Sequence, residues 1–232
     1  MLTNFRTILF HKTQLNSSTY LYYFDLIEPK EINFRPGQYV ILKVPSDKGT
    51  VSRLYSIASS NKNKNSFELI IGLIPGGLAS NYLFSLKEKT EVIFQGPAGL
   101  FELRKNNRTK IFMVTGTGIA PVRSIINSEF RTQDSEFYLF WGLKNYQDVY
   151  LFAELKKLGI KFKICLSREQ NLDMIPEEDK KYFELGHVDS CFDQLLTNSD
   201  FYLCGGRQIV ESLRQFLLGK NISAENIYFE KF

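Results

Sequence analysis

The sequence has 232 residues, of which 44% are hydrophobic, 14% aromatic and 23% charged. This composition is typical of folded globular proteins and excludes a disordered chain, and the length suits one large domain or two ordinary ones. The formal net charge is +4, and no basic run of the kind that binds nucleic acid is present. No stretch approaches the ~18 apolar residues of a membrane span, and the first residues lack the apolar core of a secretory signal. We therefore expect a soluble, cytoplasmic protein.

The cysteines and histidines give no metal-binding pattern. The three cysteines, Cys165, Cys191 and Cys204, are 26 and 13 residues apart, which matches neither a disulfide framework nor a set of metal ligands. The two histidines, His11 and His187, stand alone. We expect no metal ion held by the protein.

Residues 1–103 are predicted to form short strands separated by turns. Runs rich in aromatic and apolar residues end near Gly, Pro or Asn at Tyr20–Ile27, Tyr39–Val44, Phe67–Ile71 and Glu91–Phe94. One short helix is expected at Ala79–Leu86. Short strands at this spacing predict an antiparallel barrel or sandwich.

From residue 104 on, apolar strand cores alternate with segments of helical length. The strand cores are 111–114, 137–141, 162–166 and 201–204, and the helical segments are 121–130, 149–158 and 209–218. This alternation predicts a parallel sheet with crossover helices. The polar segment Arg104–Arg108 marks a boundary, so we predict domains over residues 1–103 and 104–232.

A glycine-rich loop, Thr115–Gly118, lies between a predicted strand and a predicted helix, and Pro121 suits the first helical position. Glycines let the backbone approach a ligand closely, and the N–H groups at a helix start favour a pyrophosphate. Because Pro121 replaces the third glycine of a G-x-G-x-x-G motif, a merely structural turn fits about as well. The position after the first strand of the domain favours a ligand, since open α/β sheets bind ligands there.

Three further segments are candidates for phosphate binding or for packing. Gly76–Ser80 gives a second helix start with small residues. Ser167 and Arg168 follow a strand and can hold a phosphate by charge-assisted hydrogen bonds, although an arginine on an exposed loop often has no specific role. Cys204 ends another strand, where a cysteine is most often a small buried hydrophobe.

The segment Ser52-Arg53-Leu54-Tyr55-Ser56 resembles the flavin-binding segment of the ferredoxin–NADP⁺ reductase superfamily. Further motifs of that superfamily occur in the expected order along the chain: one at residues 36–39, before this segment, and others after it at 76–80, 96–99, 116–121, 167–170, 204–206 and 230–232. The resemblance extends from about residue 5 to residue 232. It implies a β plus α/β fold: a six-stranded antiparallel Greek-key barrel that binds FAD over 1–103, and a parallel-sheet, Rossmann-like NAD(P)-binding domain over 104–232. It also implies an FAD-dependent NAD(P)H oxidoreductase.

The same resemblance implies roles around the flavin. Arg53 would pair with the phosphates of the flavin nucleotide, Tyr55 would pack on the isoalloxazine ring, and the hydroxyl of Ser56 would face flavin N5. The other FAD-binding residues that it implies are Leu54, Gly77, Leu78, Ala79, Ser80 and Phe232. The aromatic ring at Phe232 resembles one that stacks on the flavin in plant-type relatives, whereas in other branches this aromatic need not cover the ring.

The resemblance also implies a nicotinamide site. Cys204 would lie near nicotinamide C4, with Glu230 in the same polar cluster, and these two residues with Ser56 form the implied catalytic group. The residues implied to bind NAD(P) are Thr115, Gly116, Thr117, Gly118, Ser167, Arg168, Cys204 and Gly205.

NADP(H) is favoured over NAD(H), because Ser167-Arg168-Glu169-Gln170 resembles the segment that binds the 2′-phosphate. Lys144 could add charge to that pocket, and Tyr182 could stack on the adenine. Against this, Gly72 replaces a phosphate-binding lysine of plant-type relatives, and members that use NADH can also carry a Ser-Arg pair.

The residues do not identify the electron acceptor. The sequence has no C-x₄-C-x₂-C motif for an iron–sulfur cluster, so we expect a separate acceptor: ferredoxin, flavodoxin or an oxygenase component. The slight positive charge would suit a small acidic redox protein. An alternative is an NAD(P)H:flavin reductase that releases reduced flavin. A flavin-binding subunit without catalysis is less favoured, since the nicotinamide motifs are intact.

Overall fold

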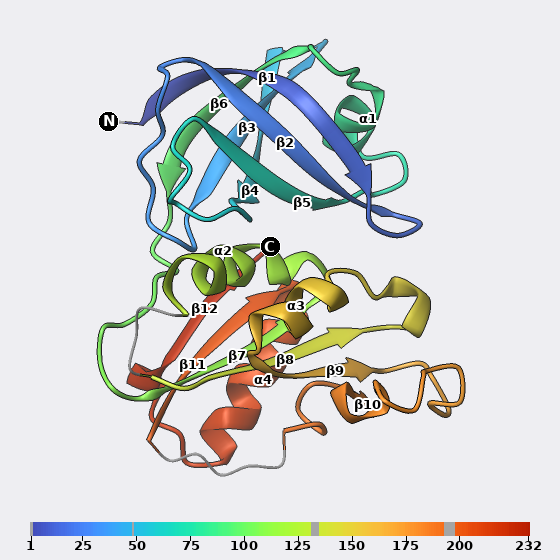
Figure 1. The fold of residues 1–232 in the computed structure, drawn as a ribbon. Helices are drawn as coiled ribbons and strands as arrows, with labels where there is room; N and C mark the ends of the chain where they lie inside the picture. Colours follow the sequence, from blue (N-terminus) through green and yellow to red (C-terminus); the bar gives the residue numbers. More distant parts are fainter. Residues whose placement is uncertain (1, 48, 131–134, 193–197) are drawn as a thin grey trace. The chain divides into compact units, whose positions relative to one another are not determined.

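The structure is a computed structural model that describes residues 2–47, 49–130, 135–192 and 198–232. The chain forms two compact units, one from residues 1–103 and 120–132 and the other from residues 104–119 and 133–232 (Figure 1). Most of helix α2 (Ile119–Glu129) thus groups with the first unit. The division into domains after residue 103 stays a prediction.

The first unit is a curled antiparallel sheet of six strands in the order β4-β3-β6-β1-β2-β5. The strands are β1 (Thr3–Gln14), β2 (Thr19–Glu28), β3 (Tyr39–Ser46), β4 (Gly49–Ser56), β5 (Ser66–Gly72) and β6 (Glu91–Ala98). A bridge between Ile57, directly after β4, and Leu69 in β5 joins the two ends of this order. The sheet therefore closes as a barrel, as predicted, and helix α1 (Leu78–Ser85) connects β5 to β6.

Aromatic side chains fill the barrel. Phe24 of β2, Phe67 of β5 and Phe94 of β6 are fully buried, and their ring centroids lie 4.9–5.7 Å apart. These residues lie on one face of their strands, because successive side chains of a strand alternate between faces. Burying each ring stabilises the barrel by about 1.5–3 kcal/mol.

The segment before β3 contacts both the chain after β6 and the residue that follows β4. Gly37 has φ +97°, and a Cβ there would lie 1.8 Å from the carbonyl oxygen of Phe101, so only glycine fits. The carbonyl of Gln38 accepts the N–H of Ile57 at 2.9 Å, and its side-chain amide donates to Gly99 at 3.2 Å. The start of β3 is thereby held against the chain after β6 and against the residue that follows β4.

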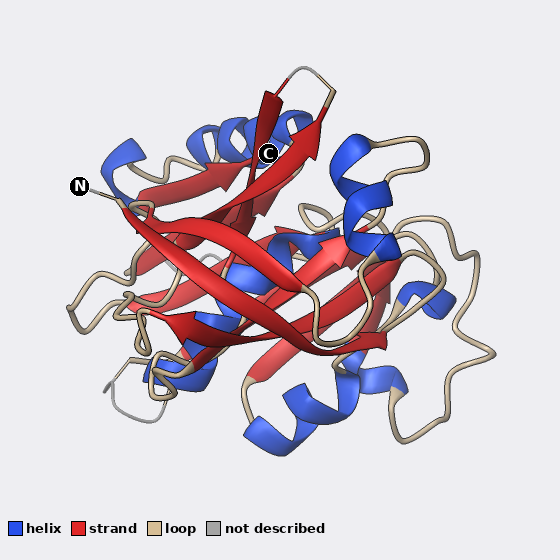
Figure 2. Cartoon of the chain, turned by 90° about the horizontal axis from the view of Figure 1, so that it is seen from above, coloured by secondary structure: helices blue, strands red, loops and turns tan. Residues whose placement is uncertain are grey.

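The second unit is a parallel sheet of six strands in the order β10-β9-β8-β7-β11-β12. The strands are β7 (Thr109–Thr115), β8 (Phe137–Leu143), β9 (Lys161–Leu166), β10 (Phe183–Leu185), β11 (Ser199–Gly205) and β12 (Ile227–Lys231). Helices α3 (Phe152–Leu158) and α4 (Arg207–Gly219) belong to this unit, with short 3₁₀ turns η1 (Gly116–Gly118), η2 (Tyr146–Asp148), η3 (Lys180–Tyr182) and η4 (Ala224–Asn226). Figure 2 shows the strands of the whole chain in red and its helices in blue. The predicted parallel sheet with helices is confirmed.

Among the described residues, no helix has the length and apolar character needed to cross a membrane.

Three predicted helix starts were wrong by two or three residues, and one of these is α4, which begins at Arg207 rather than at Ile209. Helix α2 begins at Ile119 rather than at Pro121, which lies in the first turn, where its missing N–H costs no helical bond. Helix α3 begins at Phe152 rather than at Val149, because Leu151 has φ +57° in the left-handed region. The residues before α3 therefore form a separate turn.

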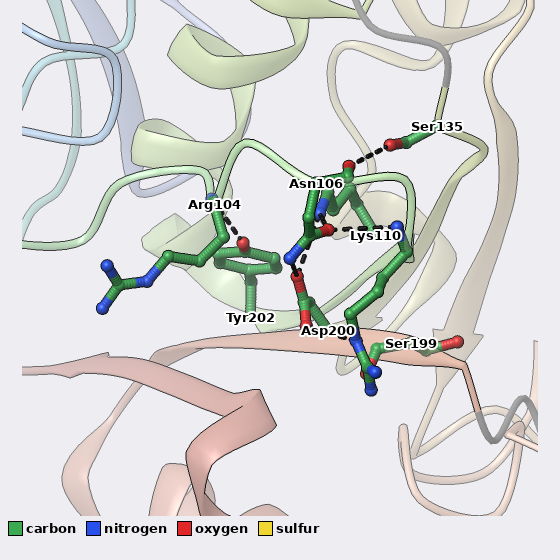
Figure 3. A network of polar contacts seen from close by, with 8 residues as sticks. Arg104, Asn106, Lys110, Ser135, Ser199, Asp200 and Tyr202 are labelled. Atoms are coloured by element: carbon green, nitrogen blue, oxygen red, sulfur yellow. Dashed lines mark hydrogen bonds and ion pairs between the residues drawn. The ribbon is translucent and has the colours of Figure 1, made fainter.

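A buried polar network joins the first residues of β7 and β11 (Figure 3). The Nζ of Lys110 lies 2.9 Å from Oδ2 of Asp200, and both side chains are at most 1% exposed. Asp200 also accepts hydrogen bonds from Arg108 Nε and Asn106 Nδ2, each at 2.9 Å. The chain segment that leads into β7 is thus fixed to β11 by one carboxylate with three donors.

Candidate functional site

The Arg53–Ser56 motif forms the end of strand β4, where Arg53 pairs with Leu42 and Tyr55 with Val40 of β3. Since side chains alternate along a strand, Arg53 and Tyr55 share one face. The exposed guanidinium of Arg53 donates to the carbonyl of Ser52 at 2.9 Å, and no carboxylate among the described residues pairs with it. Such an arginine can bind a phosphate by charge-assisted hydrogen bonds.

Tyr55 presents an aromatic ring beside this arginine. It is half-buried and packs against the hydrophobic core of the barrel. Burial raises the pKa of its hydroxyl, while the charge of Arg53 opposes the shift. Ser56 is half-buried, whereas Leu54 is 58% exposed. The structure thus brings Arg53 and Tyr55 together; the roles of all four residues stay predictions.

Helix α1 has an open N-terminus. Its N-cap, Gly77, is extended at φ −71° and ψ 130°, no side chain caps the helix, and its first turn holds no acidic residue. The first N–H groups of the helix, at Leu78 and Ala79, thus lack helical partners and favour an anion. Ser80 is buried, and its Oγ accepts the N–H of Ile74 at 2.8 Å. Its hydroxyl therefore stabilises the turn before α1, and its role in FAD binding stays a prediction.

Two glycines let the loops after β7 and β11 touch. A Cβ on Gly118 would lie 2.3 Å from the carbonyl oxygen of Cys204, and a Cβ on Gly205 would lie 2.3 Å from Oγ1 of Thr115. The parallel pairing of the two strands sets Cys204 opposite Val114. The predicted nicotinamide residues of both loops are thus adjacent at the carboxyl edge of the sheet, where open α/β sheets bind ligands.

Two aromatic side chains donate hydrogen bonds to the Thr115–Gly118 loop. Gly116 has φ +53°, and its carbonyl oxygen accepts hydrogen bonds from Trp141 Nε1 at 3.0 Å and from the hydroxyl of Tyr150 at 3.2 Å. Sequence reasoning missed both donors, because they lie 25 and 34 residues away along the chain and no motif links them to the loop.

Cys204 and Glu230 lie opposite each other on β11 and β12. Cys204 is fully buried, and burial raises the pKa of its thiol well above the ordinary value, with a further contribution from the charge of Glu230. The thiol is therefore neutral. Phe232 follows β12, and its N–H donates to the carbonyl of Gly205 at 3.2 Å, while the residue is 61% exposed.

Ser167 and Arg168 follow β9 at the same edge of the sheet. The N–H of Ser167 donates to the carbonyl of Leu143 at 3.0 Å, and the N–H of Arg168 donates to that of Lys144 at 2.9 Å. The side chains of Arg168 and Lys144 are exposed. Strand β9 is separated from β7 by β8 alone, so the ends of these two strands lie about 10 Å apart.

Tyr182, the candidate for stacking on adenine, already has an aromatic partner. Its ring stacks on Phe162 with centroids 4.7 Å apart at an interplanar angle of 11°. One face of the tyrosine is therefore covered within the protein. Among the described residues, no three His, Cys, Asp or Glu side chains gather in a way that could hold a metal ion.

Comparisons with known proteins identify the two domains of the chain. Residues 6–103 match the model of the oxidoreductase FAD-binding domain, and residues 112–215 match that of the oxidoreductase NAD-binding domain. The chain is 31% identical over 225 residues to the toluate 1,2-dioxygenase electron transfer component of Pseudomonas putida, covering 94% of this chain and 65% of that relative. It is 26% identical over 223 residues to ferredoxin–NADP reductase B of Sorangium cellulosum, covering 90% of this chain and 89% of that relative.

The fold is also that of a solved reductase. The crystal structure of a cytochrome P450 reductase from Amycolatopsis matches with a TM-score of 0.88 at 24% identity, over 100% of this chain and 70% of that chain. The chain spans 60–65% of the length of several curated relatives that it matches. With both matched domains in order and the two-unit fold, the chain belongs to the ferredoxin–NADP⁺ reductase-like family of FAD- and NAD-binding oxidoreductases.

Proposed function

We propose that this chain holds FAD and moves a hydride to it from NADPH or NADH, after which the electrons pass to a separate acceptor. The observation that supports this most strongly is that each unit has donors suited to the phosphates of a nucleotide. The first unit has the open N-terminus of α1 and, separately on β4, the exposed Arg53, and the second has the Thr115–Gly118 loop in close contact with Gly205.

The residues of the first unit fit FAD. Arg53 offers a cation with no described carboxylate partner, and the first N–H groups of α1 offer donors to the second phosphate. The half-buried ring of Tyr55 gives an apolar surface on which a flat ring can pack. When bound, FAD supplies a two-electron acceptor that can release its electrons one at a time.

The residues of the second unit are suited to positioning rather than to acid–base chemistry. Hydride transfer requires nicotinamide C4 to be held close to the accepting atom, and water to be kept out. We propose that the Thr115–Gly118 loop binds the pyrophosphate and that the nicotinamide lies beside Cys204. The neutral, buried thiol of Cys204 presents no charge there, and Glu230, opposite it on β12, supplies a polar group.

We favour NADPH as the donor. Ser167 and Arg168 lie at the carboxyl edge of the sheet, and the side chain of Arg168 is exposed without a described carboxylate partner. A guanidinium in that place can bind the 2′-phosphate that distinguishes NADPH from NADH, and the exposed amine of Lys144 can add to its charge. This preference rests on the charges of Arg168 and Lys144. It does not rest on adenine stacking by Tyr182, because Phe162 already covers one face of that ring.

For the acceptor, we propose an oxygenase component, a ferredoxin or a flavodoxin. A relative with 31% identity is named as the electron transfer component of a dioxygenase, and the net charge of +4 suits an acidic partner. The alternative is a flavin reductase, which would release its reduced flavin to solution. The two functions differ in whether FAD stays bound during purification.

The flavin site is tested by the variant Arg53→Ala. Removing a charged hydrogen bond to a phosphate costs about 1.5–3 kcal/mol, so we expect FAD affinity to fall roughly 10- to 100-fold. The measurement is flavin absorbance per mole of protein after dialysis at fixed FAD concentrations. The matched control is Arg6→Ala, which removes an exposed arginine of the same barrel that pairs with Glu91 at 3.0 Å. Equal FAD affinity in the two variants would remove Arg53 from the flavin site.

A further inference from the structure

The carbonyl oxygen of Gly116 is held by more donors than a loop carbonyl ordinarily has. Besides Trp141 Nε1 and the Tyr150 hydroxyl, it receives the backbone N–H of Ile119 at the start of α2. No atom lies within 4 Å of the position that a Cβ on Gly116 would take. The conformation of this glycine is thus fixed through its carbonyl rather than through packing around its Cα.

The direction of this carbonyl sets the direction of the next N–H group. In a trans peptide the C=O of one residue and the N–H of the following residue point in opposite directions in one plane. With the Gly116 carbonyl directed at Trp141 and Tyr150, the N–H of Thr117 points away from them. Trp141 is fully buried and Tyr150 is 6% exposed, whereas Thr117 is half-buried, so this N–H points away from the two buried rings.

The two aromatic donors are themselves rigidly placed. Trp141 lies on β8 opposite Val114, next to the strand that leads into the loop. Its ring packs against Tyr150 edge to face, with centroids 4.7 Å apart and planes at 81°. The turn before α3 is closed by a reciprocal pair in which the Asn145 N–H donates to Asp148 Oδ2 at 3.0 Å. Burial raises the pKa of the Tyr150 hydroxyl, which keeps its proton available to donate.

We infer that Trp141 and Tyr150 are positioning residues for the nicotinamide dinucleotide: by holding the Gly116 carbonyl they aim the Thr117 N–H at the nucleotide's pyrophosphate. This inference rests on the proposed function of the Thr115–Gly118 loop. It predicts that the Tyr150 hydroxyl affects how tightly the nucleotide binds more than how fast the bound nucleotide reacts.

The test uses Tyr150→Phe, which removes one donor and keeps the ring that packs on Trp141. The matched control is Tyr202→Phe, which removes a buried hydroxyl from the same unit, where it accepts the N–H of Arg104 at 2.8 Å. Anaerobic single-turnover reduction of the FAD-loaded proteins is followed at several NADPH and NADH concentrations. This separates the Kd of the nucleotide from the limiting rate of flavin reduction.

For Tyr150→Phe we expect a Kd that is about 3- to 10-fold higher, the effect of one hydrogen bond, with a limiting rate within about twofold of the parent. The Tyr202→Phe protein should match the parent in both quantities. An unchanged Kd in Tyr150→Phe, or an equal rise in both variants, would overturn the positioning role.

A third variant separates this inference from the function on which it rests. Thr117→Asp places a negative charge in the loop, which should abolish saturation by either nucleotide if the loop binds the pyrophosphate. If Thr117→Asp binds as the parent does, the proposed nucleotide site itself is wrong. If Thr117→Asp loses binding while Tyr150→Phe does not, only the role of Tyr150 is wrong.

Discussion

Replacing Gly118 by alanine should slow flavin reduction by NAD(P)H about 100-fold. The new Cβ would lie 2.3 Å from the carbonyl oxygen of Cys204 and 3.0 Å from the nitrogen of Gly205. Both are backbone atoms, so the loops after β7 and β11 must move apart. A displacement of about 1 Å at a site that acts by positioning can cost roughly two orders of magnitude in rate. The measurement is the anaerobic bleaching rate of bound flavin at a saturating nucleotide concentration.

The flavin content of Gly118→Ala should stay that of the parent, because the proposed FAD site lies in the first unit. The matched control is Gly206→Ala, since Gly206 has φ −60° and no atom within 4 Å of its Cβ position. The control should reduce flavin at the parent's rate. Equal rates in Gly118→Ala and the control would show that the close approach of the two loops has no part in hydride transfer.

Replacing Lys110 by methionine should destabilise the second unit by about 3 kcal/mol. The change keeps most of the side-chain volume but leaves the buried carboxylate of Asp200 without its buried cation. Removing one partner of a buried ion pair costs about 3–5 kcal/mol, and the remaining donors from Arg108 and Asn106 favour the lower figure. The midpoint of thermal unfolding should fall by roughly 6–12 °C, as measured by circular dichroism.

The comparison for this variant is Lys161→Met, which breaks the pair between Lys161 and Glu136, whose side chains are 59% and 61% exposed. An exposed pair contributes little to stability, so its unfolding midpoint should stay near that of the parent. Equal midpoints for Lys110→Met and Lys161→Met would contradict the structural importance of the buried network.

The fold class could be predicted because its most deeply buried strands show a clear apolar pattern in the sequence. Phe67–Ile71 and Ile111–Val114 are continuous runs of mostly apolar residues, and they form the buried parts of β5 and β7. Strand β4 was not predicted from its pattern, since most of its residues are exposed and it offers no alternation of apolar and polar positions. Strands β10 and β12 are short edge strands of three and five residues, too brief for periodicity to identify them.

The motifs of the candidate site could be located in sequence, but the contacts that organise them could not. Gly118 and Gly205 can be named as loop residues from the sequence. That neither has room for a side chain follows only from the pairing of β7 with β11, which brings each glycine against the other loop. Tyr150 was expected inside a helix, because Val149–Leu158 is apolar enough to suggest one. Because the backbone of Leu151 is left-handed, the helix begins only at Phe152. Tyr150 therefore lies outside the helix, and its hydroxyl donates to the carbonyl of Gly116.

The visible spectrum of the purified protein, recorded before and after anaerobic addition of NADPH or NADH, tests the central claim most directly. We predict a flavin spectrum that persists through purification and bleaches on adding either nucleotide, faster with NADPH. Faster bleaching by NADH would leave the reductase function intact and remove the 2′-phosphate role of Ser167 and Arg168. A colourless protein that reduces added flavin would favour the flavin reductase instead. Bound flavin that neither nucleotide bleaches would contradict the proposed hydride transfer.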